Sequence, residues 1–303
     1  MKPFYDATNV PQHDTEKSKF EFDSWLNVPK VSVEDAKHAN KVALAHLNSG
    51  ADGILFDLKS KVQPEHLLDG IELQHCHIFF LLDGYARGFY DLFHDFVRGK
   101  KVKPNGGFYF NDSDFEIGVK DFQYGLKVAP NENCADQISS AFKTAASRID
   151  KLTNCGIYPR DALRAISFLW PVRQNFFISI SEMRAMQVVW ELFCEAYGAS
   201  DVPIFLHAIS PPFVSDNFQP HENLIKQTTC GLAAVLGNCS ALTCEPKKED
   251  SSMLTRTARN ISSILKEESH LDKVIDPLAG TYFIEQASRE LAEAAWKKFQ
   301  QVV

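Results

Sequence analysis

Four carboxylate side chains stand at the ends of short apolar runs, where acid–base or metal chemistry would be possible. They are Asp57, Asp83, Asp112 and Glu245. Paired carboxylates can serve as acid and base, or hold Mg²⁺, when burial drives their pKa values apart. The competing interpretation, which we favour, is that they cap the helices that follow, because helix N-termini attract negative charge.

Three histidines offer a second kind of chemistry. His75 and His77 flank Cys76 where an apolar run begins, and strand alternation would point both imidazoles the same way, as a metal site needs. At the N-terminal end of a strand, however, they would lie on the structural side of a barrel, so we favour a structural role. His207, near the end of its run, is expected to orient a neighbour by hydrogen bonding rather than to act as a base.

Common catalytic and metal motifs are not found in the sequence. It holds no P-loop, no GxGxxG after a strand, no HExxH and no GxSxG. The seven cysteines are scattered and form no CxxC pair, which favours reduced thiols in a cytoplasmic protein. Cys239 and Cys244 could ligate a metal, but no second pair stands at ligand spacing.

Size and charge exclude several classes of partner. The 303 residues are 45% hydrophobic, enough for a sizeable core, and the net charge is −7. Nucleic acid and anionic membranes need a basic face, so we expect neither as a partner. No apolar run approaches the roughly 20 residues of a membrane span, and the N-terminus has no signal-peptide layout.

Short apolar runs alternate with segments of helical period, which is typical of a parallel sheet built from βα units. The runs show little alternation, as expected for strands buried on both faces. Eight strands are predicted, at 24–28, 53–58, 77–83, 107–112, 125–129, 166–172, 203–209 and 241–245.

Helices are predicted between these strands. Ser32 is expected to cap the first one, with Asp35 in a capping-box position and Gly50 at its end. Further helices are predicted at 136–154, 178–197, 221–236, 251–268 and 286–301.

The fold class is therefore α/β, with a (β/α)8 TIM barrel at 24–303 after an irregular segment at 1–23; an open doubly wound sheet is the alternative. Ligands of such barrels meet the C-terminal ends of the strands. The residual pocket candidates there are Asn111, Asn175, His207, Ser210 and Glu245. We expect Phe110, Trp170 and Phe213 to fill the barrel axis.

Four stretches resemble the barrel domain of the methylmalonyl-CoA mutase family. MKPFYDATNVP at 1–11 resembles the N-terminal segment of that family, and NFFISISEMRAMQVVW at 175–190 resembles one of its helices. RTARNISSILKEESHL at 256–271 and DPLAGTYFIE at 276–285 resemble two more specific motifs. The similarity covers nearly the whole chain and independently implies the barrel.

The resemblance implies a radical rearrangement between methylmalonyl-CoA and succinyl-CoA. In the family, adenosylcobalamin sits against the barrel mouth and the pantetheine of CoA threads the barrel axis. The cofactor supplies the radical chemistry, and the protein shields the radical and holds the thioester.

Several residues depart from the pattern of active members. Val128 and Ala129 stand where the family has a Tyr-His pair, and Pro211 replaces part of a donor-rich turn. In the helix after Asn175, Ser179 and Glu182 replace a Glu and a Lys. The Asp-x-His-x-x-Gly segment that supplies the lower cobalt ligand has no match, and we expect the flavodoxin-like cobalamin domain to be absent.

These departures resemble the non-catalytic small (beta) subunit of heterodimeric mutases. The implied function is to support a large catalytic subunit, in a heterodimer or else a self-dimer, with no catalytic, cofactor-binding or metal-binding residues of its own. Adenosylcobalamin is then implied only for the complex. Two alternatives stay open: an acyl-CoA or small-molecule binding barrel, and an active mutase chain whose cobalamin domain is another polypeptide.

Overall fold

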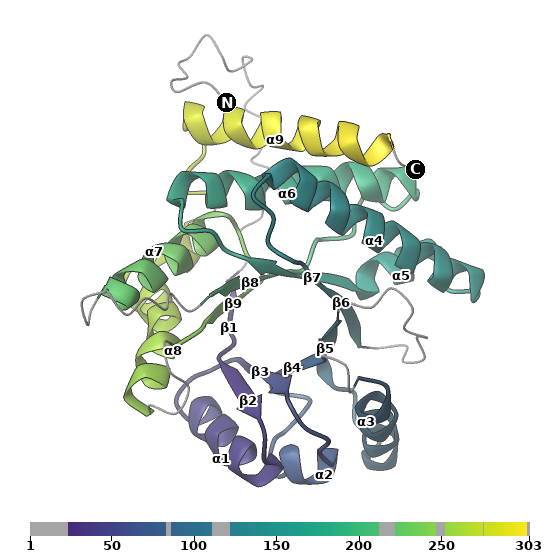
Figure 1. Ribbon diagram of the computed structural model, residues 1–303, viewed down its shortest axis with the longest axis vertical. Coiled ribbons are helices and arrows are strands. Elements are labelled where there is room, and N and C mark those ends of the chain that lie inside the picture. Colours follow the sequence, from purple (N-terminus) through teal and green to yellow (C-terminus); the bar gives the residue numbers. More distant parts are fainter. Residues whose placement is uncertain are drawn as a thin grey trace.

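The computed structural model describes residues 24–82, 86–110, 122–211, 222–246, 252–274 and 276–301. A parallel sheet lies at its centre and helices surround it (Figure 1). The strands are β1 (Leu26–Asn27), β2 (Lys30–Val33), β3 (Gly53–Leu58), β4 (His77–Leu82), β5 (Asn105–Phe110), β6 (Gln123–Lys127), β7 (Ile166–Pro171), β8 (Leu206–Ser210) and β9 (Ala241–Cys244).

The sheet closes on itself through its first strand. The order of neighbours is β1-β9-β8-β7-β6-β5-β4-β3-β2, and only Val28 and Pro29 separate β1 from β2. Val28 N donates to Leu242 O of β9, and Leu55 N of β3 donates to Pro29 O. β1 and β2 are thus one strand interrupted at a proline, which has no N–H to donate. The predicted (β/α)8 barrel is confirmed, and the open sheet is excluded because it would leave two unpaired edges.

The helices follow the strands around the barrel (Figure 1). Asp35, rather than Ser32, is the N-cap of the first helix: its carboxylate accepts from His38 N, while Ser32 lies within β2. The prediction for Ser32 was wrong because the first strand runs farther than its apolar run. The helices are α1 (Ala36–Leu47), α2 (Pro64–Leu67), α3 (Ala86–Lys100), α4 (Cys134–Asn154), α5 (Pro159–Ala165), α6 (Phe176–Ala196), α7 (Glu222–Leu236), α8 (Ser252–Glu267), the 3-10 turn η1 (Leu271–Lys273) and α9 (Tyr282–Gln300).

Side chains on the outward face of the strands form the larger part of the core, packed beneath the helices. Phe80 and Phe108 meet Phe93 of α3, and Phe168 meets Trp190 of α6. A second helical layer lies outside the first, since α9 packs across α6 and α4 (Figure 1). Phe299 of α9 contacts Phe193 of α6 with ring centroids 5.8 Å apart. The barrel therefore has separate inner and outer cores.

Candidate functional site

Aromatic rings fill the barrel axis. The rings of Phe79 on β4 and His207 on β8 have centroids 5.1 Å apart, although β4 and β8 stand on opposite sides of the barrel. Tyr109 on β5 lies 5.6 Å from Phe79 and 5.5 Å from His207. All three side chains are fully buried, and Leu55 and Leu169 pack in the same cluster. We call Phe79, Tyr109 and His207 the axial plug.

A chain of hydrogen bonds fixes the imidazole of the plug. Thr243 Oγ1 donates to the backbone carbonyl of Val28, so it must accept from His207 Nε2, 2.8 Å away. With its proton on Nε2, the neutral His207 ring accepts at Nδ1 from the Tyr109 hydroxyl, at 3.1 Å. Both ring nitrogens are therefore engaged, and neither is available to a substrate or a metal.

Burial also sets the protonation of the plug. Desolvation lowers the pKa of His207 to about 3, since charging a group in an apolar interior is unfavourable. The same burial raises the pKa of Tyr109, and the Ser167 hydroxyl opposes that rise. Near neutral pH both groups are uncharged, so the axis holds a neutral network and not an acid–base pair.

A glycine makes room for the plug. A Cβ on Gly125 would lie 2.0 Å from Cδ1 of Tyr109, closer than any real contact, so the tyrosine ring occupies the space above that strand. Our expectation that Phe110 and Trp170 fill the axis was wrong: both belong to the outer clusters. Successive side chains of a strand point to opposite faces, so an assignment shifted by one residue reverses the face. Phe213 lies outside the described residues.

An ion cluster stands at the C-terminal end of the barrel. Lys30 pairs closely with Glu245 and lies 3.8 Å from Asp57 Oδ2. Lys59 Nζ lies 2.8 Å from Asp57 Oδ1. Asp57 and Glu245 do approach the same place, as the sequence suggested, but lysines neutralise them. Asp57 does not cap α2, whose N-cap is Gln63. Asp83 and Asp112 lie outside the described residues.

The remaining pocket candidates are dispersed. Asn175 is the N-cap of α6 and accepts from Ile178 N at 3.2 Å. Ser210 is buried and shares the outward face of β8 with Ala208, which belongs to an outer cluster. Asn111 lies outside the described residues. The structure thus brings Glu245 to the ion cluster and His207 to the plug. Ser210 meets Glu245 only through the backbone, where its carbonyl accepts from Glu245 N at 3.1 Å, and Asn175 belongs to neither group.

Two of the departures from the family pattern bind the same arginine. Arg173, just after β7, donates from Nε to Glu182 Oε2 at 2.8 Å. Its backbone N–H donates to the Ser179 hydroxyl at 3.1 Å, and a second guanidinium nitrogen donates to Gln137 at 2.7 Å. Burial raises the pKa of Glu182, and the Arg173 guanidinium opposes the rise. At this strand end Ser179 and Glu182 both bind Arg173, while the buried Nε2 of Gln137 has no hydrogen-bond partner among the described residues.

The motif residues hold the scaffold. Arg184 of α6 donates through two nitrogens to the two oxygens of Asp276, both at 3.0 Å, and both side chains are buried. Trp25 Nε1 donates to the Ser262 hydroxyl at 2.8 Å, which ties the first strand to α8. Bidentate arginine–carboxylate pairs fix orientation as well as distance. These contacts involve residues of three of the four stretches that resemble the family, 175–190, 256–271 and 276–285, and give them a structural role.

The other sequence features show no arrangement for chemistry. His75 is exposed at 3.8 Å from Glu72, and all seven cysteines are free thiols. Within the described residues no group of three or more His, Cys, Asp or Glu side chains is placed to hold a metal ion. None of the helices described has the length and apolar character of a membrane-spanning segment.

Sequence reasoning missed Lys30, Tyr109 and Thr243. Each lies on the inward face of its strand. For Tyr109 and Thr243 no alternation marked that face, because their strand segments are buried on both sides. For Lys30 the strand Lys30–Val33 does alternate, but it is only four residues long and was not predicted. Gly125 was the one available signal, since a glycine within a strand often marks the close approach of another group.

The sequence of this chain is similar to those of known proteins. The sequence model of the family described as methylmalonyl-CoA mutase matches residues 132–303, more than half of the chain. The methylmalonyl-CoA mutase small subunit of Porphyromonas gingivalis is 32% identical over 174 residues, covering 55% of this chain and 28% of that protein. The small subunit of Streptomyces virginiae is 29% identical, covering 56% of this chain and 28% of that protein.

Mutases that are not named as subunits also match. The methylmalonyl-CoA mutase of Escherichia coli is 27% identical, covering 56% of this chain and 25% of that protein. The matched part thus spans less than a third of these relatives. A crystal structure of Plasmodium falciparum HPPK-DHPS covers 82% of this chain and 47% of its own, at 14% identity and a TM-score of 0.46. That likeness is too weak to carry an argument.

Proposed function

Because this chain belongs to the methylmalonyl-CoA mutase family, we propose that it is the barrel region of a small, non-catalytic mutase subunit. In this proposal it supports an active large subunit in a heterodimer. The two relatives named as small subunits support the choice of subunit. A cytoplasmic location belongs to the same proposal, since the seven cysteines are free thiols.

The axial plug is the observation that carries the proposal. The resemblance implies that the pantetheine of CoA threads the axis of an active barrel. Here Phe79 and His207 touch across that axis, and Tyr109 lies against both. A thioester could enter only if these buried rings left their places and the hydrogen bonds of His207 broke. A preformed pocket, as most small-molecule sites have, does not exist at this level of the barrel.

The described residues on the axis and at the mouth of the barrel do not fit adenosylcobalamin. An imidazole that ligates cobalt needs a free nitrogen, whereas His207 is enclosed and both of its nitrogens have partners. At the mouth, Asp57 and Glu245 are each paired with Lys30. We therefore assign no catalytic step to this chain, and we propose that the cofactor is held elsewhere in the complex.

Binding and assembly measurements test the proposal. The chain should form a complex with the large mutase subunit of the same organism, detected by size exclusion with light scattering. Calorimetry should show no heat for methylmalonyl-CoA or succinyl-CoA with this chain alone, while the large subunit serves as the positive control. No complex at micromolar concentrations would refute the proposal.

The alternatives predict different results in the same assays. A micromolar calorimetric signal with a CoA thioester would favour an acyl-CoA binding barrel. Turnover on adding adenosylcobalamin and a separate cobalamin-binding chain would favour an active mutase whose cofactor domain is another polypeptide. A stable self-dimer that ignores the large subunit would replace the heterodimer.

A further inference from the structure

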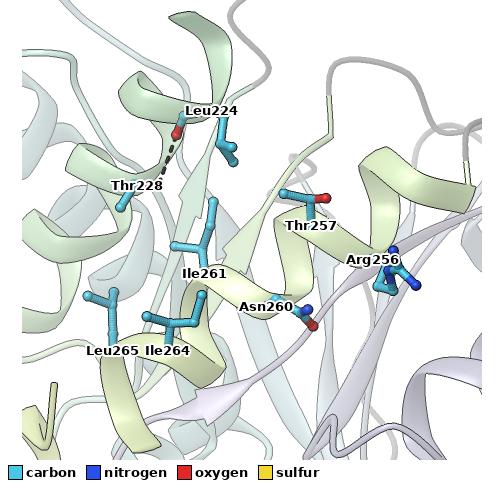
Figure 2. A pocket seen from close by; sticks show the side chains of 8 residues that line it. All are labelled: Leu224, Thr228, Arg256, Thr257, Asn260, Ile261, Ile264 and Leu265. Atoms are coloured by element: carbon cyan, nitrogen blue, oxygen red, sulfur yellow. Dashed lines mark hydrogen bonds between the residues drawn. The ribbon is translucent and has the colours of Figure 1, made fainter. Parts of the chain in front are cut away.

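A groove between two outer helices has the composition of a docking site. Its volume is about 330 Å³, and it lies between α7 and α8 (Figure 2). Figure 2 shows the apolar side chains on one side, and Arg256 and Asn260 on the other. The apolar lining is Leu224, Ile261, Ile264 and Leu265, and Thr228 and Thr257 complete it.

The polar side of the groove presents a guanidinium, and no acidic side chain is among the described residues that line the groove. Arg256 is exposed, and it has no acidic partner among the described residues. Asn260 Oδ1 already accepts from Arg259 at 3.0 Å, which leaves the amide nitrogen of Asn260 to face the groove. The hydroxyls of Thr228 and Thr257 donate to carbonyls of their own helices, so their oxygens face the groove only as acceptors. The donors left are Arg256 and the Asn260 amide, and a carboxylate is the group that would complement the guanidinium of Arg256.

Neighbouring positive charge strengthens the demand for an anion. Burial and the nearby Arg256 guanidinium both lower the pKa of Arg259. The Arg259 Nε atom is buried without a hydrogen-bond partner in the described part of the chain. His46 of α1 is buried, and burial together with Arg259 lowers its pKa to about 4, so it is neutral near neutral pH and adds no positive charge. Arg256 and Arg259 are therefore the like charges held near each other, and an anionic ligand would offset their repulsion.

The surroundings of the groove favour a protein over a small acid. Ile264 is 48% exposed, and Ile225 of α7 and Met253 of α8 are 65% and 67% exposed. A small carboxylate would leave these side chains in water, whereas a protein segment would cover them along with the groove. Interfaces combine such an apolar centre with a charged rim.

We propose that the α7–α8 groove docks a segment of the large mutase subunit that places an apolar side chain in the groove and a carboxylate on Arg256. This inference rests on the proposed function, because it names the surface by which the small subunit meets its partner. A symmetric self-dimer through the same face would pair this patch with itself, and the described lining of the groove holds no carboxylate to meet Arg256. A different chain can supply the opposite charge.

Charge reversal and an apolar-to-acid change test the groove. Arg256→Glu and Ile264→Asp should each weaken binding of the large subunit at least about tenfold, measured by biolayer interferometry. The matched controls are Arg98→Glu and Leu92→Asp on α3, which lies on another side of the barrel (Figure 1) and also exposes an arginine and a leucine. Both controls should bind like the unchanged chain. Circular dichroism melts exclude misfolding as the cause.

The possible outcomes distinguish a failure of the proposed docking site from a failure of the proposed function. If the unchanged chain does not bind the large subunit, the proposed function fails. If it binds and both groove variants bind equally well, the docking site is wrong and the function stands. If Arg256→Glu and Ile264→Asp abolish only a self-dimer of this chain, then the groove binds a second copy of the chain and the proposal is overturned. If succinate binds at micromolar concentration and Arg256→Glu removes this binding, then the groove is a site for a small acid and the proposal is also overturned.

Discussion

The plug makes the barrel sensitive to acid through His207. Its pKa is about 3 in the folded chain, against 6.5 for an ordinary imidazole. Below pH 6.5 the unfolded chain takes up a proton that the folded barrel refuses, so stability falls as the pH falls, until about pH 3. The slope is about 1.4 kcal/mol per pH unit for one proton. From pH 7.5 to pH 5 the loss from this residue is about 2 kcal/mol.

Replacing the imidazole should remove that dependence. In His207→Gln the slope of unfolding free energy against pH should fall by about one proton between pH 6.5 and pH 4. Urea unfolding followed by circular dichroism at each pH measures the slope. His75→Gln is the matched control, because it makes the same substitution at a side chain that is 74% exposed and lies outside the plug.

A direct titration of the His207 ring can refute this reasoning. In a proton NMR titration, the ring signals of His207 should not move between pH 8 and about pH 5. If His207 titrates near pH 6.5, or if His207→Gln keeps the full slope, then the imidazole is hydrated. The axis would then be open to water, and the reasoning from the plug would fail.

Two further changes test the scaffold around the site. Gly125→Ala should destabilise the barrel by about 1 to 3 kcal/mol or more, because its Cβ would collide with Tyr109. Gly99→Ala is the control, because Gly99 lies in a helix with open space around it, and this change should stabilise the protein by about 0.5 to 1 kcal/mol. If Gly125→Ala and Gly99→Ala shift the urea midpoint equally, then Gly125 is not packed against Tyr109. Arg184→Ala should cost about 3 to 5 kcal/mol because it leaves the buried Asp276 carboxylate unpaired. A thermal melt of Arg184→Ala that matches the unchanged chain would show that this ion pair is exposed.

The order of strands and helices was legible from the sequence. Apolar runs such as 53–58 and 166–172 match β3 and β7 closely because a buried parallel strand must be apolar along its length. Long amphipathic segments predicted α4, α6 and α8 within a few residues. The short helices α2 and α5 were missed, since four and seven residues give too little periodicity to detect. The prediction also missed α3, although its 15 residues are long enough to show a helical period.

The sequence by itself determined the family and the frame of this protein, because motifs such as 276–285 and the alternation of strand and helix are local patterns. Only the tertiary structure decided which face of each strand points inward. That choice placed Tyr109 and His207 in the axis and sent Phe110 and Trp170 outward. It depends on contacts between residues far apart in the chain, such as Phe79 with His207 and Lys30 with Glu245, and on how the barrel closes. No periodicity within a single segment records those contacts.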